Sequence, residues 1–363
     1  MLNSLDYLNL RGDLTFDKDP INDIDLFLCS QLAAPDYKNI ISTNVNEKTI
    51  KEISEEYFKN HTTDVSNLGV LQSSYVLPML KEMASSARFK NVIISGYGNI
   101  IDMQEEEQFS AITIRISNNT YVVSFRGTDD TLIGWKEDFN LSIYDEVPAQ
   151  RDAKRYLDSV SKKFLGKIYV VGHSKGGNLA VYAASNAKKS VQRRIVKVIS
   201  FDGPGFNDSF FEKEGYKNLQ DRIFTVISQN SIVGTLLQTA GKVEIVHSRV
   251  EGAMAHDGFN WEVKYNYFVN EDKLSDLSNH INKIMDETLS KLTFEEKKDF
   301  IDSLFDSLMS TGFETITDFK SNNYIDSAKV LVNVGSNKNV RNFAKSIIRT
   351  IEKYSVSKIK SEL

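Results

Sequence analysis

The sequence is poor in cysteine, and this excludes a disulfide scaffold. Its 363 residues contain a single cysteine, Cys29, which cannot pair within the chain. Cys29 lies in Asp-Leu-Phe-Leu-Cys-Ser-Gln-Leu, which is typical of the buried face of a helix, so we interpret it as a core residue and not as a catalytic thiol. No cysteine and histidine cluster has the spacing of a zinc site, and the five histidines are dispersed. We therefore expect no metal and no cofactor.

The sequence also lacks long apolar runs and any concentration of basic residues. No run approaches the ~20 apolar residues of a membrane-spanning helix. Residues 1–13 have neither the basic nor the apolar part of a cleaved signal peptide, which favours the cytoplasm, although export without a cleaved signal leaves no trace in a sequence. The net charge is −5 and the lysines are scattered, so nucleic acid is not an expected partner.

The pattern of apolar residues changes twice along the chain and predicts three regions. Residues 1–88 have mainly helical spacing and are expected to pack on the core that follows. Residues 89–268 alternate between strands and helices, as in a mostly parallel sheet with helices on both faces. Residues 269–363 read as a helical C-terminal appendage rich in lysine and acidic side chains. Strands are predicted at 91–96, 110–116, 120–125, 167–171, 196–201, 222–227 and 243–247, and the main helices of the last two regions at 150–164, 178–188, 272–289, 293–310 and 340–359.

The most informative motif is Gly172-His173-Ser174-Lys175-Gly176, which lies between a predicted strand and a predicted helix. In a nucleophile elbow, a tight strand-to-helix turn holds a serine at its tip, and the flanking glycines allow close approach of the backbone. A glycine-bounded turn whose serine merely caps a helix is the simpler alternative. Because strand, turn and helix follow one another in the required order, Ser174 is the predicted nucleophile.

A serine nucleophile needs a general base, and three histidines follow Ser174 in the chain. His247 lies in a strand-like run and His280 among helical residues, so both are interpreted as structural. His256 lies in a loop after the last predicted strand, where it can reach the elbow. We therefore predict His256 as the base.

The acid that orients the histidine is less clearly marked. Asp202 directly follows the predicted strand 196–201 and precedes Gly-Pro-Gly, which places a carboxylate at the expected crevice. The usual position is one strand later, where the sequence has Asn230 and Ser231 and no carboxylate. Asp257, beside the histidine, is more typical of a loop cap. Asp202 is the predicted acid, with Asn230, Ser231 and Asp257 as the alternatives.

The oxyanion of an acyl-transfer reaction needs two hydrogen-bond donors. One is expected to be the backbone N–H of Lys175, the residue after the nucleophile. The other is expected from Thr128, in the loop Arg126-Gly-Thr-Asp-Asp130 after strand 120–125. Asp138, ten residues further, is predicted to hold the Thr128 hydroxyl, although an ordinary surface turn would have the same sequence.

Together, Phe125-Arg-Gly-Thr128, Trp135-x-x-Asp138 and Gly172-His-Ser-x-Gly-Gly177 resemble class 3 (fungal-type) lipases of the α/β-hydrolase fold, over roughly residues 108–261. That resemblance implies Thr128 and Lys175 as the oxyanion hole with Asp138 in support. The acid departs from it, and Phe201-Asp-Gly-Pro-Gly205 is instead similar to the acid motif of pancreatic-type lipases, which strengthens Asp202. Over its whole length the chain resembles little-characterised bacterial hydrolases called Mbeg-like.

These observations predict a serine hydrolase that cleaves carboxylic esters through a Ser-His-Asp triad and an acyl-enzyme. A lipase, phospholipase or esterase with an acyl ester or lipid as substrate is expected, and peripheral contact with a membrane and a protein partner are left open. Segment 231–237 is apolar and would line an acyl pocket, act as a lid or pack in the core. The alternatives are an inactive lipase-like scaffold that binds a lipid or protein, and an amidase or peptidase with the same triad.

Overall fold

The computed structural model describes residues 1–41, 47–60, 73–102, 104–129, 132–289, 292–309, 338–342 and 345–346. Its centre is an eight-stranded sheet whose strands lie side by side in chain order, from β1 to β8. The strands are β1 (Lys48–Thr49), β2 (Ile93–Asp102), β3 (Glu107–Ser117), β4 (Thr120–Phe125), β5 (Lys167–His173), β6 (Ile195–Phe201), β7 (Ile223–Ser228) and β8 (Lys242–Val246). Strands β4 to β8 are parallel, whereas β1 to β4 pair antiparallel.

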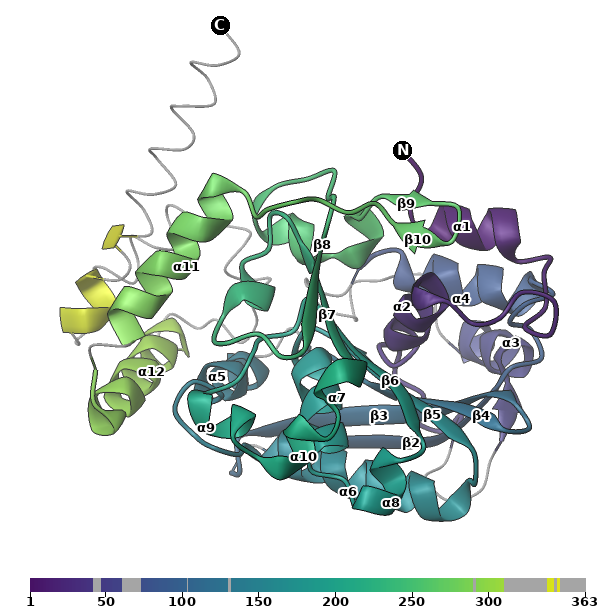
Figure 1. Cartoon of the computed structure of the whole chain (residues 1–363), viewed down its shortest axis with the longest axis horizontal. Coiled ribbons are helices and arrows are strands. Elements are labelled where there is room, and N and C mark those ends of the chain that lie inside the picture. The colour runs from purple at the N-terminus through teal and green to yellow at the C-terminus, as the bar shows by residue number, and fades with distance from the viewer. Residues whose placement is uncertain are drawn as a thin grey trace, which may run out of the picture.

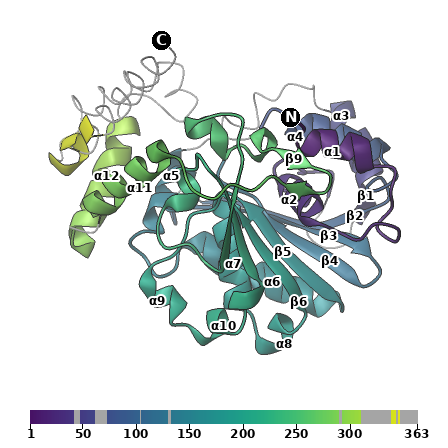
Figure 2. The ribbon, with the colours of Figure 1, turned by 45° about the horizontal axis from the view of Figure 1, so that its top comes forward.

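Helices cover both faces of this sheet because successive residues of its central strands are apolar on both sides. In β5, Val171 faces a core shared with the N-terminal helices, while Val170 faces the core on the opposite side. Ile199 and Val198 of β6 divide in the same way. The helices of the second face are α6 (Pro148–Lys163) and α7 (Lys175–Ser185), with α8 (Lys189–Gln192) and α10 (Glu214–Lys217) at its edge (Figure 2).

The N-terminal region covers the first face with α1 (Ser4–Arg11), α2 (Asp23–Gln31), α3 (Ile50–Asn60) and α4 (Val76–Ser85). Pro78 lies in the first turn of α4, where the helix needs no N–H from it. Arg88 ties this region together from within, because its guanidinium bonds both carboxylate oxygens of the buried Asp25 at 2.8 and 2.5 Å. Phe27 of α2 contacts the rings of Phe259 and Trp261, so the N-terminal region also supports the loop after β8.

The C-terminal helices α11 (Asp276–Leu289) and α12 (Phe294–Met309) lie beside α5 (Leu132–Asn140), on the side of the sheet away from α1 to α4 (Figure 1). A small core of α12 side chains packs against Leu132 and Phe139 of α5. Lys136 strengthens this contact by pairing with Asp302 at 2.7 Å and Glu106 at 2.9 Å. The third predicted helix, 340–359, is described only at 338–342 and 345–346, which are helical, and its remainder lies outside the described residues.

The remaining elements are short. They are α9 (Asp208–Phe211), the 3-10 turns η2 (Gln220–Arg222), η3 (Val233–Thr235), η4 (Gly252–His256) and η5 (Gly258–Asn260), and a separate antiparallel pair, β9 (Val263–Lys264) with β10 (Tyr267–Phe268). The sequence pattern did not predict β9 and β10, because two-residue strands carry no periodicity.

The architecture confirms the predicted α/β-hydrolase fold with a helical C-terminal region. The carboxyl ends of β4 to β8 meet at one edge of the sheet, where a ligand crevice is expected. In the part of the chain that is described, no helix has the length and apolar character needed to cross a membrane. The division at residues 88 and 268 stays a prediction.

Candidate active site

Ser174 has the backbone geometry of a nucleophile elbow. It stands alone between the end of β5 and the start of α7, with φ 57° and ψ −135°, a left-handed conformation that costs free energy for any residue with a side chain. A Cβ atom on Gly172 would lie 2.1 Å from the carbonyl carbon of Gly176, and one on Gly176 would lie 2.2 Å from the carbonyl oxygen of Phe125. The two glycines therefore permit the turn and its contact with β4.

The elbow lies directly beside Asp202, which the sequence places 28 residues further along. The Ser174 N–H donates to the carbonyl of Phe201 at 2.9 Å, and Phe201 is the last residue of β6. Asp202 follows it with φ 51°, and its own N–H donates to the carbonyl of Val226 at 2.8 Å. The parallel pairing of β5, β6 and β7 thus delivers serine and carboxylate to one edge.

His256 reaches the same edge from the end of η4, and its Nδ1 lies 2.6 Å from Oδ2 of Asp202. Both side chains are buried. A carboxylate only accepts, so Nδ1 carries the proton of the neutral ring and Nε2 is left with its lone pair. His256 Nε2 is buried and finds no hydrogen-bond partner among the residues that the structure describes. That nitrogen can therefore take a proton from a neighbouring hydroxyl.

His173, the residue before Ser174, connects the His256 loop to the elbow. The two imidazole rings lie 4.6 Å apart between centroids, and His173 Nε2 lies 2.8 Å from the His256 carbonyl oxygen. Burial lowers the pKa of His173 to about 3, with the neighbouring His256 adding to the effect. His173 is therefore neutral near pH 7 and donates its Nε2–H to that carbonyl, which holds the His256 loop against the elbow.

The loop after β4 lies against Ser174. A Cβ atom on Gly127 would meet the His173 carbonyl oxygen at 2.7 Å and the Ser174 Cβ at 3.0 Å, so only glycine allows this approach. Thr128 follows it, and its hydroxyl donates to Asp138 Oδ2 at 2.6 Å. The hydrogen bond expected between Thr128 and Asp138 is present.

Asp138 is a buried carboxyl, and burial raises its pKa to about 7. The charge of Lys175 and the hydrogen bond from Thr128 act in the opposite direction, since both favour the ionised form. Asp138 therefore changes its protonation near neutral pH.

Comparison with models of known protein families shows which family the chain belongs to. The Mbeg1-like family model matches residues 83–306, which is more than half of the sequence. The chain belongs to the Mbeg1-like family. No curated protein matches the sequence.

Several solved lipase structures also match the Mbeg1-like chain. M37 lipase is 19% identical, with a TM-score of 0.35 over 48% of this chain and 64% of its own length. The nonglycosylated LIP2 lipase of Yarrowia lipolytica is 14% identical, with a TM-score of 0.37 over 52% of this chain and 74% of the lipase. A fungal lipase in complex with an inhibitor is 16% identical, with a TM-score of 0.36 over 56% of this chain and 83% of the lipase. The chain thus spans less than two thirds of the length of M37 lipase.

The alternatives considered for the triad acid have other contacts. Asn230 donates from Nδ2 to the Val250 carbonyl at 2.9 Å, and the Ser231 hydroxyl accepts the Gly234 N–H at 2.9 Å. Asp257 accepts the Phe259 N–H at 3.0 Å and so caps η5. Of the other histidines, His247 bonds Glu271 at 2.7 Å and His280 bonds the Asp276 carbonyl within α11. Of these candidates, the structure brings only Asp202 to His256.

Sequence reasoning missed the partners of the Lys175 side chain, which is fully buried. Its ammonium donates to Glu137 Oε2 at 2.8 Å and to the carbonyl and side-chain oxygens of Gln108 at 2.8 and 3.0 Å. Gln108 Oε1 also accepts the Asp129 N–H at 3.3 Å, and Glu137 Oε1 accepts the Ala149 N–H at 3.1 Å. The network joins the elbow to the Thr128 loop, α5 and α6. Lys175 is the one charged residue of α7, whose sequence is otherwise small, apolar or neutral, and this was the available signal, because a buried ammonium requires an anion.

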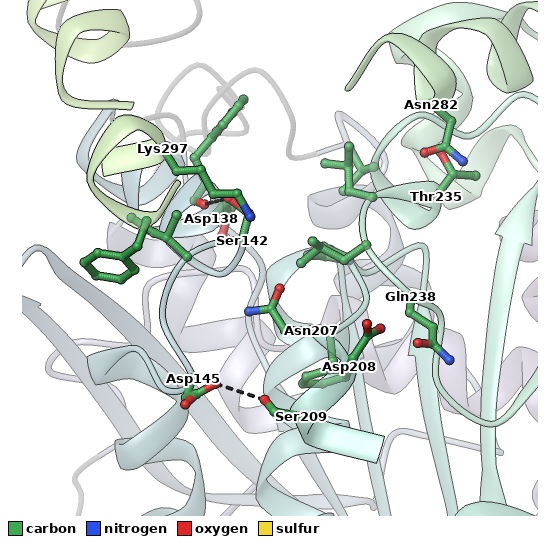
Figure 3. Close-up of a pocket in the computed structure, with 18 of the residues that line it drawn as sticks. Asp138, Ser142, Asp145, Asn207, Asp208, Ser209, Thr235, Gln238, Asn282 and Lys297 are labelled. Atoms are coloured by element: carbon green, nitrogen blue, oxygen red, sulfur yellow. Dashed lines mark hydrogen bonds between the residues drawn. The ribbon is translucent and has the colours of Figure 1, made fainter. Parts of the chain in front are cut away.

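A cavity of about 730 Å³ opens beside Asp138 (Figure 3). Its walls come from α5, the segment 204–209 after β6, the turn 233–238 after β7, and helices α11 and α12. Residues 233 and 235–237 of the predicted apolar segment line it, which favours a role in binding over plain core packing. Among the described residues, no group of three or more metal-ligating side chains could hold an ion.

Proposed function

We propose that this protein is a serine hydrolase that cleaves carboxylic esters of acyl lipids, with Ser174 as nucleophile, His256 as base and Asp202 as acid. The observation that carries the proposal is the buried His256–Asp202 hydrogen bond, which leaves Nε2 without a partner among the described residues, at the sheet edge where the strained Ser174 also lies. Strain at a serine and an unpaired buried nitrogen both cost stability, and both are what nucleophilic catalysis requires.

In the proposed reaction, Ser174 Oγ attacks the acyl carbonyl carbon while His256 Nε2 takes its proton. The carbonyl oxygen becomes an oxyanion that accepts hydrogen bonds from the Lys175 N–H and from Thr128, whose orientation Asp138 maintains. Collapse of this intermediate breaks the ester bond, and the alcohol leaves with the proton from His256. Water then attacks the acyl-enzyme with His256 again as base, which releases the acid and restores Ser174.

The acyl chain is proposed to occupy the cavity beside Asp138. Phe206, Val233 and Leu236 supply apolar wall, and the volume of about 730 Å³ is in the range of small-molecule sites. Peripheral contact with a membrane surface would deliver such a substrate and remains part of the proposal.

Labelling with a fluorophosphonate tests the nucleophile. Wild-type protein and the control variant Ser161→Ala, on α6, are expected to label, whereas Ser174→Ala is expected to label at no detectable rate. Labelling that persists in Ser174→Ala would exclude Ser174 as the nucleophile.

Hydrolysis of esters tests the other two residues. We expect His256→Ala and Asp202→Asn to lower kcat by about 10⁴-fold or more, while the control His247→Gln keeps it. Folded wild-type protein without esterase activity would favour a binding scaffold, and faster cleavage of matched amides than of esters would favour an amidase or peptidase.

A further inference from the structure

The cavity beside Asp138 is apolar over much of its wall, and one of the side chains that line it is a lysine of the C-terminal region. Phe139 and Ile143 come from α5 and the residues after it, Phe206 from the segment after β6, and Leu237 from the turn after β7. Lys297 joins them from the first turns of α12. Its side chain is half-buried and extends from α12 into the cavity (Figure 3).

Lys297 differs from the cations around it because its ammonium has no partner among the described side chains. Lys298, the next residue, pairs with Asp302 at 2.8 Å. Lys136 on the facing helix pairs with Glu106 and with the same Asp302. In the described part of the chain, no hydrogen bond or ion pair engages the Lys297 side chain. A half-buried ammonium without an anion gains free energy when a ligand supplies one.

The carboxyl groups of the cavity do not take that role. Asp145 accepts the Ser209 hydroxyl at 2.9 Å, and both Asp145 and Asp208 are exposed. Asp138 is buried and accepts the Thr128 hydroxyl, and because its pKa is about 7 it is only partly ionised at neutral pH. α12 packs directly on α5, so Lys297 and Asp138 stand on two helices in contact and line one cavity. A ligand anion at Lys297 would therefore lie on the side of the cavity formed by α5, the helix that carries Asp138.

We propose that Lys297 forms a subsite for a negatively charged group, a phosphate or a carboxylate, carried by an acyl ester whose chain lies on the apolar wall. The inference rests on the proposed function for the reaction and adds the charge of the substrate. It also assigns the C-terminal helical region a part in substrate recognition.

Binding to Ser174→Ala protein tests the subsite without any turnover. Calorimetric titrations would compare decyl phosphate, decanoate, uncharged decyl glucoside and inorganic phosphate, each below micelle formation. Decyl phosphate or decanoate, or both, should bind about tenfold more tightly than decyl glucoside, and added salt should reduce the difference. The two anions distinguish phosphate from carboxylate as the preferred group, and inorganic phosphate should bind weakly because it has no chain.

Two further variants in the Ser174→Ala background locate the effect. Lys297→Gln is expected to remove the tenfold preference and Lys297→Glu to reverse it, whereas Lys298→Gln, which removes the same charge one residue away, should keep it. Equal losses in Lys297→Gln and Lys298→Gln, or an anionic amphiphile that binds no better than decyl glucoside, would overturn the proposal. Inorganic phosphate that binds as tightly as decyl phosphate would overturn the assignment of the apolar wall.

Turnover provides the second readout. The ratio of kcat/KM for monodecanoyl glycerol phosphate to that for monodecanoyl glycerol should fall about tenfold in Lys297→Gln and stay within twofold in Lys298→Gln. Absence of hydrolysis by wild-type protein would refute the proposed function, while the binding titrations would still decide for or against the subsite.

Discussion

Replacing Lys175 by methionine is expected to destabilise the fold by about 3 to 5 kcal/mol, because it removes the cation of a buried ion pair and leaves the Glu137 carboxylate buried without it. The side chains of Lys175 and Glu137 are 0% and 1% exposed, with the ammonium 2.8 Å from the carboxylate. Methionine is close to lysine in volume, so little of the loss comes from packing. The remaining Glu137 keeps hydrogen bonds from the N–H groups of Gln108 and Ala149, which places the loss nearer the lower bound.

The double variant Lys175→Met with Glu137→Gln separates the charge from the hydrogen bonds. The neutral amide no longer leaves a buried anion without its cation, so the double variant should be more stable than the sum of the two single losses predicts, by about 1 to 2 kcal/mol. Lys189→Met is the matched control. Its pair with Glu214 has almost the same length, 2.7 Å, but the side chains are 69% and 74% exposed, so its loss should be much smaller.

Urea unfolding followed by tryptophan fluorescence gives the free energy of unfolding of each variant. The kinetics of an ester substrate give a second measure, because a shifted elbow displaces the Lys175 N–H from the developing oxyanion and lowers kcat more than it raises KM. A Lys175→Met protein as stable as Lys189→Met, or losses that simply add in the double variant, would refute the reasoning.

Two further predictions concern the carboxyl groups of the site. Burial raises the pKa of Asp138 from 3.8 to about 7, so between these pH values the folded protein keeps a proton on this carboxyl that the unfolded chain has released. The resulting contribution of Asp138 to the free energy of unfolding is complete below pH 3.8, falls as pH rises and is lost above about pH 7. The free energy of unfolding of the wild-type protein should therefore fall between about pH 4 and 7 relative to that of Asp138→Asn, which has no carboxyl group to titrate. A difference between the two proteins that does not change with pH would contradict the raised pKa of Asp138. Gly234→Ala would place a Cβ atom 2.4 Å from Asp202 Oδ1, so we expect kcat for an ester to fall at least tenfold and stability to fall by about 1 to 3 kcal/mol. The control Gly98→Ala, whose Cβ would find its nearest neighbour at 3.6 Å, should change kcat little, and equal activity of the two variants would show that Asp202 tolerates the displacement.

Local signals in the sequence determined where the central strands begin and end and where the elbow lies. The strands from 120 to 246 were predicted close to their observed bounds because each is a short apolar run between turn residues. Gly172 and Gly176 marked the turn at Ser174, since only residues without a Cβ fit its contacts. Thr128 and Asp138 were predicted as a pair from the loop after strand 120–125 and from the resemblance to class 3 lipases, and ten residues are few enough for a loop and one helix to bring them together.

Contacts between distant segments were decided only by the tertiary structure. Asp202 and His256 are 54 residues apart, and the sequence left Asn230, Ser231 and Asp257 as alternatives because their distances depend on how β6, β7 and the loop after β8 lie at the sheet edge. Lys175 meets Glu137 across 38 residues and Gln108 across 67, and no periodicity encodes which buried carboxylate a lysine will find. The same holds for Lys297, whose position in the cavity exists only because α12 packs on α5. Covalent neighbours and spacing therefore identified Ser174 as the proposed nucleophile, whereas packing decided which charges surround it.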